Sequence, residues 1–197
     1  MTMWILSLEW LLLAVLFFWV IGAFKRLKRI RQESKQAFAA VDAQLMQTID
    51  WLRSCARLKT LQERLDGVPI EHAQHALLPS ADLLENALLQ ARQHPLRSET
   101  IAALESTWQG AQVAWLAYMQ LSQSAANTDD EQVQEWLLRW QQLTTVHRHS
   151  AEQFNAAVTD YNQAIAQFPA CAIARLSGLK AARTFQKDTA LLMQSSA

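Results

Sequence analysis

About the first third of the chain is one uninterrupted helical stretch that begins apolar and ends amphipathic. No Pro or Gly occurs between Ala23 and Asp66, so nothing in this part stops a helix. Trp4 to Phe24 is almost wholly apolar and, at ~1.5 Å per residue, matches a hydrocarbon core of ~30 Å. This pattern predicts a transmembrane helix that continues directly into a soluble helix ending near Leu65. The rest of the chain then has to pack on the soluble half.

Charge on either side of the apolar stretch predicts its orientation. No Lys or Arg precedes it, whereas a basic belt follows at once: Lys25, Arg26, Lys28, Arg29 and Arg31. Cytoplasmic flanks of membrane spans collect such residues, and anionic headgroups attract them. We therefore expect a single-pass protein of a cell inner membrane, with its N-terminus outside and the remaining chain in the cytoplasm. A cleaved signal peptide would carry its positive charge before the apolar segment.

One carboxylate, Glu9, lies within the predicted span, and two interpretations stand. In the first, it lies in the outermost helical turns, where the helix dipole and the nearby interface favour a negative charge. Trp4 and Trp10 fit that interface, since indoles prefer the headgroup level. In the second, Glu9 is buried and pairs with a cation of another membrane protein.

Length and composition leave room for one soluble domain beside the anchor. The chain has 197 residues, and its formal net charge of zero conceals a split, since residues 25–35 hold 6 of the 18 Lys and Arg. We divide it into a transmembrane anchor (1–24), a cytoplasmic helical bundle (25–169) and a basic tail (170–197). Nucleic acid is not expected as a partner, because basic and aromatic residues do not alternate.

Apolar residues recur every three or four positions in four segments, which predicts an all-α, antiparallel up-down bundle of about four helices. In the first two segments the inward positions are Phe38, Val41, Leu45, Ile49, Leu52, Ala56, Leu77, Leu84, Leu88 and Ala91. In the third they are Ile101, Leu104, Trp108, Ala111, Trp115 and Tyr118. In the fourth, expected to run from Glu131 to Phe168, they are Val133, Leu137, Trp140, Thr144, His147, Ala151, Phe154, Val158, Tyr161, Ile165 and Phe168.

The antiparallel arrangement returns the tail to the membrane end of the bundle. Its apolar residues are interspersed with cations: Ile173, Leu176, Leu179 and Phe185 among Arg175, Lys180, Arg183 and Lys187. One interpretation is a basic amphipathic segment that lies on the inner leaflet. The other is a partly ordered cap over the end of the bundle.

Two motifs resemble one family. Residues 37–45 (AFAAVDAQL) resemble the Ala-aromatic-x-x-Ile-Asp-x-Gln-Leu signature of the LemA family. Residues 154–162 (FNAAVTDYN), followed by Phe168-Pro169, are similar to its aromatic-Asn-x-x-Val-x-x-Tyr-Asn and Phe-Pro elements, whereas residues 67–127 match poorly. The resemblance implies a membrane-anchored antiparallel bundle without established catalytic residues. It also implies an association with membrane stress responses or with a membrane zinc metallopeptidase, as for some members.

The polar residues of these motifs suggest a contact between the two long helices. Antiparallel helices starting at a common membrane end would bring Asp42 and Gln44 near Asn155, Tyr161 or Asn162. We expect a polar clasp that fixes the register of the helices, because a buried polar group needs a partner. The alternative is that each of these side chains is solvated separately.

No set of residues amounts to a reaction, and we expect neither an enzyme nor a cofactor nor a metal site. Glu71-His72-x-x-His75 lacks the HExxH order, and His147 lies on an apolar face, where a satisfied core residue is the commoner role. Cys55 and Cys171 form no CxxC pair and are expected to be reduced thiols.

The function that these features favour is a membrane-anchored scaffold or adaptor. Apolar residues beyond one helical face suggest a homo-oligomer or a membrane partner, such as a protease: Trp51, Leu83, Leu89, Leu116 and Trp136. The alternative is a protein that binds or shapes membrane lipids with its basic belt and tail.

Overall fold

The computed structural model describes residues 2–57, 70–125 and 131–186, and in these ranges the protein consists of five helices without a strand. The helices are α1 (Thr2–Arg57), α2 (Ile70–Gln93), α3 (Ser98–Ala125), α4 (Glu131–Ala166) and α5 (Ala170–Leu176). The all-α class is thus confirmed, with the short α5 as an unexpected addition. The expected continuation of the first helix to Leu65 lies outside the described residues.

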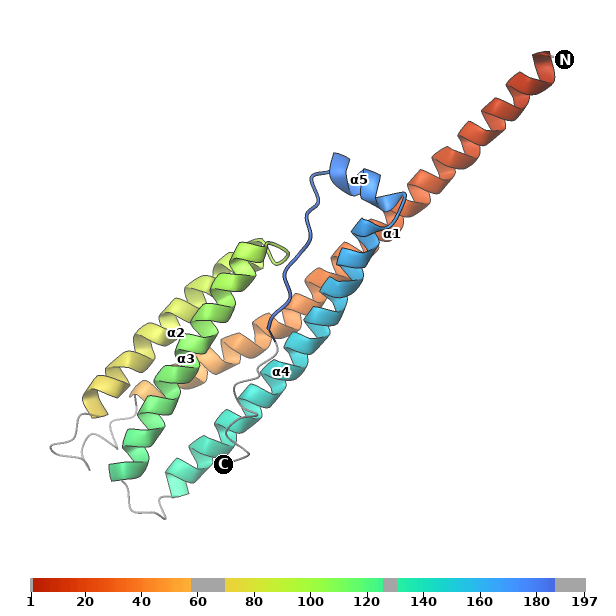
Figure 1. Cartoon of the computed structure of the whole chain (residues 1–197). Helices are drawn as coiled ribbons and strands as arrows, with labels where there is room; N and C mark the ends of the chain where they lie inside the picture. Colours follow the sequence, from red (N-terminus) through yellow and green to blue (C-terminus); the bar gives the residue numbers. More distant parts are fainter. Residues whose placement is uncertain (1, 58–69, 126–130, 187–197) are drawn as a thin grey trace.

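Helix α1 has two different environments along its length. Residues 10–20 are exposed, and in Figure 1 the N-terminal part of α1 projects beyond the other helices. From Leu27 onward one face of α1 is buried in the bundle. Among the described helices, α1 alone is long enough and apolar enough to cross a membrane.

The predicted inward faces are confirmed in the first three helices. All the described positions named for α1, α2 and α3 are buried, from Phe38 to Tyr118. Pro79 lies inside α2 without ending it. In α4, six of the eleven predicted positions are buried. Four are half-buried, namely Leu137, Trp140, Thr144 and Ile165, and Phe168 is 75% exposed because the helix ends at Ala166.

The bundle is built from two pairs of helices rather than from four equivalent neighbours. Helices α2 and α3 form one antiparallel pair and α1 and α4 the other, and α1 also packs on α2. In contrast, α3 and α4 touch little, and Figure 1 shows the two pairs diverging. We call the α1–α4 contact the tight seam and the α3–α4 contact the wide seam.

The described part of the tail, up to residue 186, packs into the bundle, and Lys187 lies outside the described residues. After α5, Gly178 adopts a left-handed conformation (φ +64°), which favours glycine. The chain then runs back between the two helix pairs as an extended tail segment, residues 179–186 (Figure 1). Ala182 and Phe185 of this segment belong to the hydrophobic core. Burial in this core removes the ring of Phe185 from water, which stabilises the packed tail segment.

Candidate functional site

Aromatic rings fill the wide seam. The indole of Trp140 on α4 lies 5.2 Å from that of Trp115 and 5.8 Å from that of Trp108, both on α3, measured between ring centroids. Trp51 of α1 adds a ring 4.5 Å from Trp115, and Tyr118 contacts Trp136 at 6.0 Å. Because indoles are the largest side chains, they bridge a separation that Leu or Ala would leave empty.

The tail segment continues this filling toward the α5 end of the bundle (Figure 1). The ring of Phe185 lies 5.4 Å from Phe154 and 6.3 Å from His147, both on α4. Phe154 in turn contacts Phe38 of α1 at 5.7 Å. The tail therefore supplies a ring to the core where α3 and α4 do not meet.

Two asparagines of α4 hold the backbone of the tail segment. The side-chain amide of Asn155 donates to the Phe185 carbonyl (2.9 Å) and accepts from the Phe185 N–H (2.7 Å). Asn162 does the same with Ala182, at 2.8 Å for both bonds. A carboxamide carries the donor and acceptor of a peptide group, so each asparagine pairs with the tail as a neighbouring strand would.

The spacing of the two asparagines explains why both can pair with the backbone of the tail segment. Asn155 and Asn162 are seven residues apart on a helix, or about 10.5 Å along its axis. Ala182 and Phe185 are three residues apart in extended chain, or about 10 Å. The helix thus presents two amides at the interval at which an antiparallel extended chain presents peptide groups.

Further polar contacts fix the tail from both sides of the wide seam. Glu105 of α3, only 7% exposed, accepts from the Arg183 guanidinium (2.9 Å) and from the Gln186 N–H (2.5 Å). The Tyr161 hydroxyl of α4 donates to the Lys180 carbonyl (3.1 Å), and burial raises the pKa of Tyr161. The seam therefore recognises mainly backbone groups of the segment that it holds.

A cavity of about 570 Å³ opens beside the end of the tail segment, lined by residues of α3, α4 and the tail. His147 and Trp108 are in its wall, with ring centroids 4.4 Å apart. Among the described residues, His147 Nδ1 and Trp108 Nε1 are buried polar atoms without a hydrogen-bond partner. Burial lowers the pKa of His147 to about 4, so the imidazole is neutral at physiological pH.

The residues expected to form a polar clasp between α1 and α4 make the following bonds in the structure. Asp42 accepts from Arg92 of α2 (2.5 Å), and Gln44 donates to the Leu143 carbonyl of α4 (3.2 Å). Asn155, Tyr161 and Asn162 bond instead to the tail, as described above. Asp42 lies on the side of α1 that α2 covers, where the guanidinium of Arg92 offers a charged partner.

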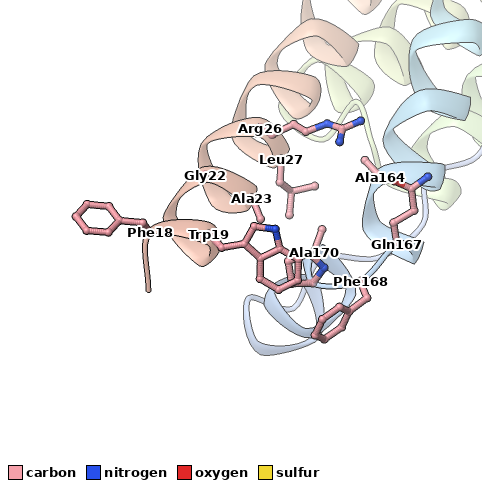
Figure 2. Close-up of a pocket in the computed structure, with 11 residues that line it drawn as sticks. Phe18, Trp19, Gly22, Ala23, Arg26, Leu27, Ala164, Gln167, Phe168 and Ala170 are labelled. Atoms are coloured by element: carbon pink, nitrogen blue, oxygen red, sulfur yellow. The ribbon is translucent and has the colours of Figure 1, made fainter. Parts of the chain in front are cut away.

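Every residue of the basic belt is exposed on α1, and Arg26 lines a second hollow. This cleft, about 470 Å³, lies between α1 and the corner where α4 turns into α5 (Figure 2), and we call it the juxtamembrane cleft because it lies beside the predicted span. Trp19 contacts Phe168 across it, with ring centroids 5.3 Å apart. Arg29 pairs with Glu33 one turn along the helix (3.4 Å).

The remaining chemical candidates stay apart. The side chains of His72 and His75 lie outside the described part, and His149 contacts Gln153 (3.0 Å) on the same helix. In the described ranges no three His, Cys, Asp or Glu side chains gather as metal ligands would. Cys55 and Cys171 are free thiols, and burial raises the pKa of Cys55 to about 12.

No family model, curated protein or solved structure matches this chain. The resemblance to the LemA family therefore stays a prediction carried by residues 37–45 and 154–162.

Glu105 and the tail residues were missed by the sequence reasoning. A signal for Glu105 was present, because it stands four residues after Ile101 and therefore on the inward face. The interval of seven between Asn155 and Asn162 was a second signal. Neither signal identifies the tail as the bonding partner, because residues 179–186 show no helical periodicity.

Proposed function

We propose that this protein is a single-pass membrane scaffold or adaptor whose bundle holds a second copy of the chain or a membrane partner. The N-terminus faces outward, the basic belt meets the inner leaflet and the bundle stands in the cytoplasm. The resemblance to the LemA family favours a membrane protease or another component of envelope quality control as the partner.

The wide seam is the single observation that carries this proposal. It is a groove between two helix pairs that holds an extended peptide by its backbone, through Asn155, Asn162 and Glu105. Backbone contacts give affinity to any extended segment, and pockets for alternate side chains give specificity. The seam therefore suits a segment with a small residue at the place of Ala182 and an aromatic one at the place of Phe185.

In the structure the wide seam holds the tail segment of the same chain. This suggests how the seam would hold a segment of another chain. A tail from a neighbouring copy has the same sequence and would make the same bonds, as in domain swapping. A partner segment would displace the tail instead. Either exchange lets the scaffold hold another chain without enlarging the bundle.

In-cell cross-linking followed by gentle extraction and mass spectrometry tests the proposal. A ladder of self-adducts supports self-association, and a stoichiometric second membrane protein supports an adaptor. Recovery of the uncross-linked monomer alone would overturn both forms.

A pair of variants connects that result to the seam. Asn155→Leu with Asn162→Leu removes four hydrogen bonds to the tail, so the adduct pattern should change. Asn86→Leu, at an exposed position of α2, is the matched control and should leave the pattern unchanged. Equal patterns in all variants would place the contact elsewhere on the bundle and would contradict the role of the seam.

A further inference from the structure

The juxtamembrane cleft lies at the depth where a lipid headgroup meets its acyl chains. Trp19, Gly22, Ala23 and Arg26 occupy one face of α1, at the three-and-four spacing, and form one wall. Trp19 lies six residues before Lys25, the start of the basic belt, or about 9 Å along the helix axis. Phe168, which contacts Trp19, is therefore drawn to the same depth from the other side.

The two ends of the cleft differ in chemistry, as Figure 2 shows. Trp19, Phe168 and Ala170 gather at one end, and the Arg26 guanidinium extends over the other, near Ala164 and Gln167. Within the described ranges Arg26 makes no ion pair, in contrast to Arg29, which pairs with Glu33. A cleft with an apolar floor and one free cation at its mouth matches a molecule with an acyl chain and a phosphate.

We propose that the juxtamembrane cleft is a binding site for one anionic phospholipid of the inner leaflet. An acyl chain lies along Trp19, Gly22 and Phe168, and the Arg26 guanidinium binds the phosphate, with the Gln167 amide as a further donor. The site joins α1 to the α4–α5 corner through the lipid. This inference rests on the proposed membrane span of α1, and it adds a discrete ligand to the general attraction of the belt for anionic lipid.

Gly22 offers a way to fill the cleft without disturbing the fold. A Cβ added at Gly22 would meet no heavy atom within 4 Å, so a larger side chain enters open space. Gly22→Leu should therefore block the acyl chain while keeping the helix. Val20→Leu enlarges an exposed side chain of the same helix that does not line the cleft, and it is the matched control.

Arg26→Gln removes the charge at the mouth of the cleft. Its matched control is Lys25→Gln, which removes a neighbouring charge of the belt outside the lining of the cleft. One cation near an anionic lipid surface contributes a factor of about five. Because this general contribution applies to both positions, the preference for anionic over zwitterionic lipid should fall by more than about fivefold in Arg26→Gln and by a clearly smaller factor in Lys25→Gln.

The experiment uses the full chain in nanodiscs of phosphatidylcholine with a minority of phosphatidylglycerol, extracted gently and weighed by native mass spectrometry. Wild type should retain one phosphatidylglycerol per chain, and excess inorganic phosphate should not displace it. Gly22→Leu should retain neither lipid. Equal retention in wild type and Gly22→Leu, equal losses in Arg26→Gln and Lys25→Gln, or displacement by free phosphate would overturn the site.

Alkaline carbonate extraction of membranes from the expressing cells separates this inference from the proposed function. A chain released by carbonate would overturn the membrane span, and with it both proposals. A chain that resists carbonate yet retains no lipid would overturn the cleft alone and leave the scaffold standing.

Discussion

Helix α4 lies against two neighbours at two different separations. On α1 it packs so closely that the short side chain of Ser34 reaches the Ala157 carbonyl at 3.0 Å. Toward α3 it stands far enough away that indoles and a length of extended chain fill the space between. A small side chain at a helix contact allows the backbones to approach, and a large one holds them apart. The difference shows that large aromatic residues at heptad spacing can indicate a gap that a third element fills.

Truncating the central ring of the wide seam should have the largest effect. Trp115 is fully buried and contacts Trp51, Tyr118 and Trp140, so Trp115→Ala leaves a cavity that the other rings do not close. We expect a loss of about 3–5 kcal/mol in the free energy of unfolding. Urea denaturation of the full chain in mild detergent, followed by circular dichroism, measures it.

The residue next to Trp115 provides the control for this change. Leu116 is 44% exposed, and Leu116→Ala removes little buried surface, so its cost should be below about 1 kcal/mol. Similar losses in the two variants would mean that the wide seam does not depend on its rings.

The next effect concerns the pH dependence of the same seam. The pKa of His147 falls from 6.5 to about 4 because burial disfavours the charged imidazole. Between these pH values the unfolded chain binds a proton that the folded chain does not, so the free energy of unfolding falls as the pH drops. The full difference, reached near pH 4, is about 3 kcal/mol at ~1.36 kcal/mol per pH unit.

Comparison of variants isolates the contribution of His147 from that of the carboxylates. His147→Phe keeps a ring without a titrating group, so its stability should fall less steeply from pH 6.5 to 4 than that of wild type. His149→Gln, an exposed site on the same helix, should keep the wild-type slope. If the free energy of unfolding fell with pH at the same slope in wild type and His147→Phe, burial of His147 would not lower the pKa of its imidazole.

The tight seam was more predictable from the sequence than the wide one, and helical periodicity explains why. Phe38, Val41 and Leu45 repeat at the helical interval, and a helix with one apolar face buries that face whatever its partner is. Periodicity cannot specify which helix supplies the partner of an exposed polar group. Asp42 bonds to Arg92 of α2 rather than to Asn155, a pairing that periodicity alone does not indicate.

The tail was the least predictable element for a related reason. Its segment 179–186 is extended, so its contacts follow neither a period of 3.6 nor the alternation of a sheet. The length match between Asn155 and Asn162 on one side and Ala182 and Phe185 on the other becomes visible only when the chain direction is known. The sequence therefore indicates that Asn155 and Asn162 are polar residues of α4, but it does not indicate that they bond to the tail.

Loss of one asparagine should loosen the wide seam by an intermediate amount. Asn162→Ala removes two hydrogen bonds to Ala182, at about 1 kcal/mol each, for a total near 2 kcal/mol. Hydrogen exchange of the Ala182 amide should accelerate, while amides of α1 near Ile49 keep their protection. Asn86→Ala, on the exposed face of α2, should change neither quantity. Unchanged exchange at Ala182 in Asn162→Ala would contradict the pairing.

The smallest predicted effect compares the loss of one hydroxyl in each seam. Ser34 is fully buried, and its hydroxyl lies 3.0 Å both from the Ile30 carbonyl of its own helix and from the Ala157 carbonyl across the tight seam. Ser34→Ala should cost about 1 kcal/mol, because it leaves the Ala157 carbonyl without this donor. Thr144 lines the cavity of the wide seam and bonds only within its own helix, to the Trp140 and Gln141 carbonyls. Thr144→Ala should be close to neutral, because the better helix propensity of alanine offsets those bonds. Urea denaturation of both variants measures the two losses in the free energy of unfolding. A larger loss for Thr144→Ala than for Ser34→Ala would contradict the closer packing of the tight seam.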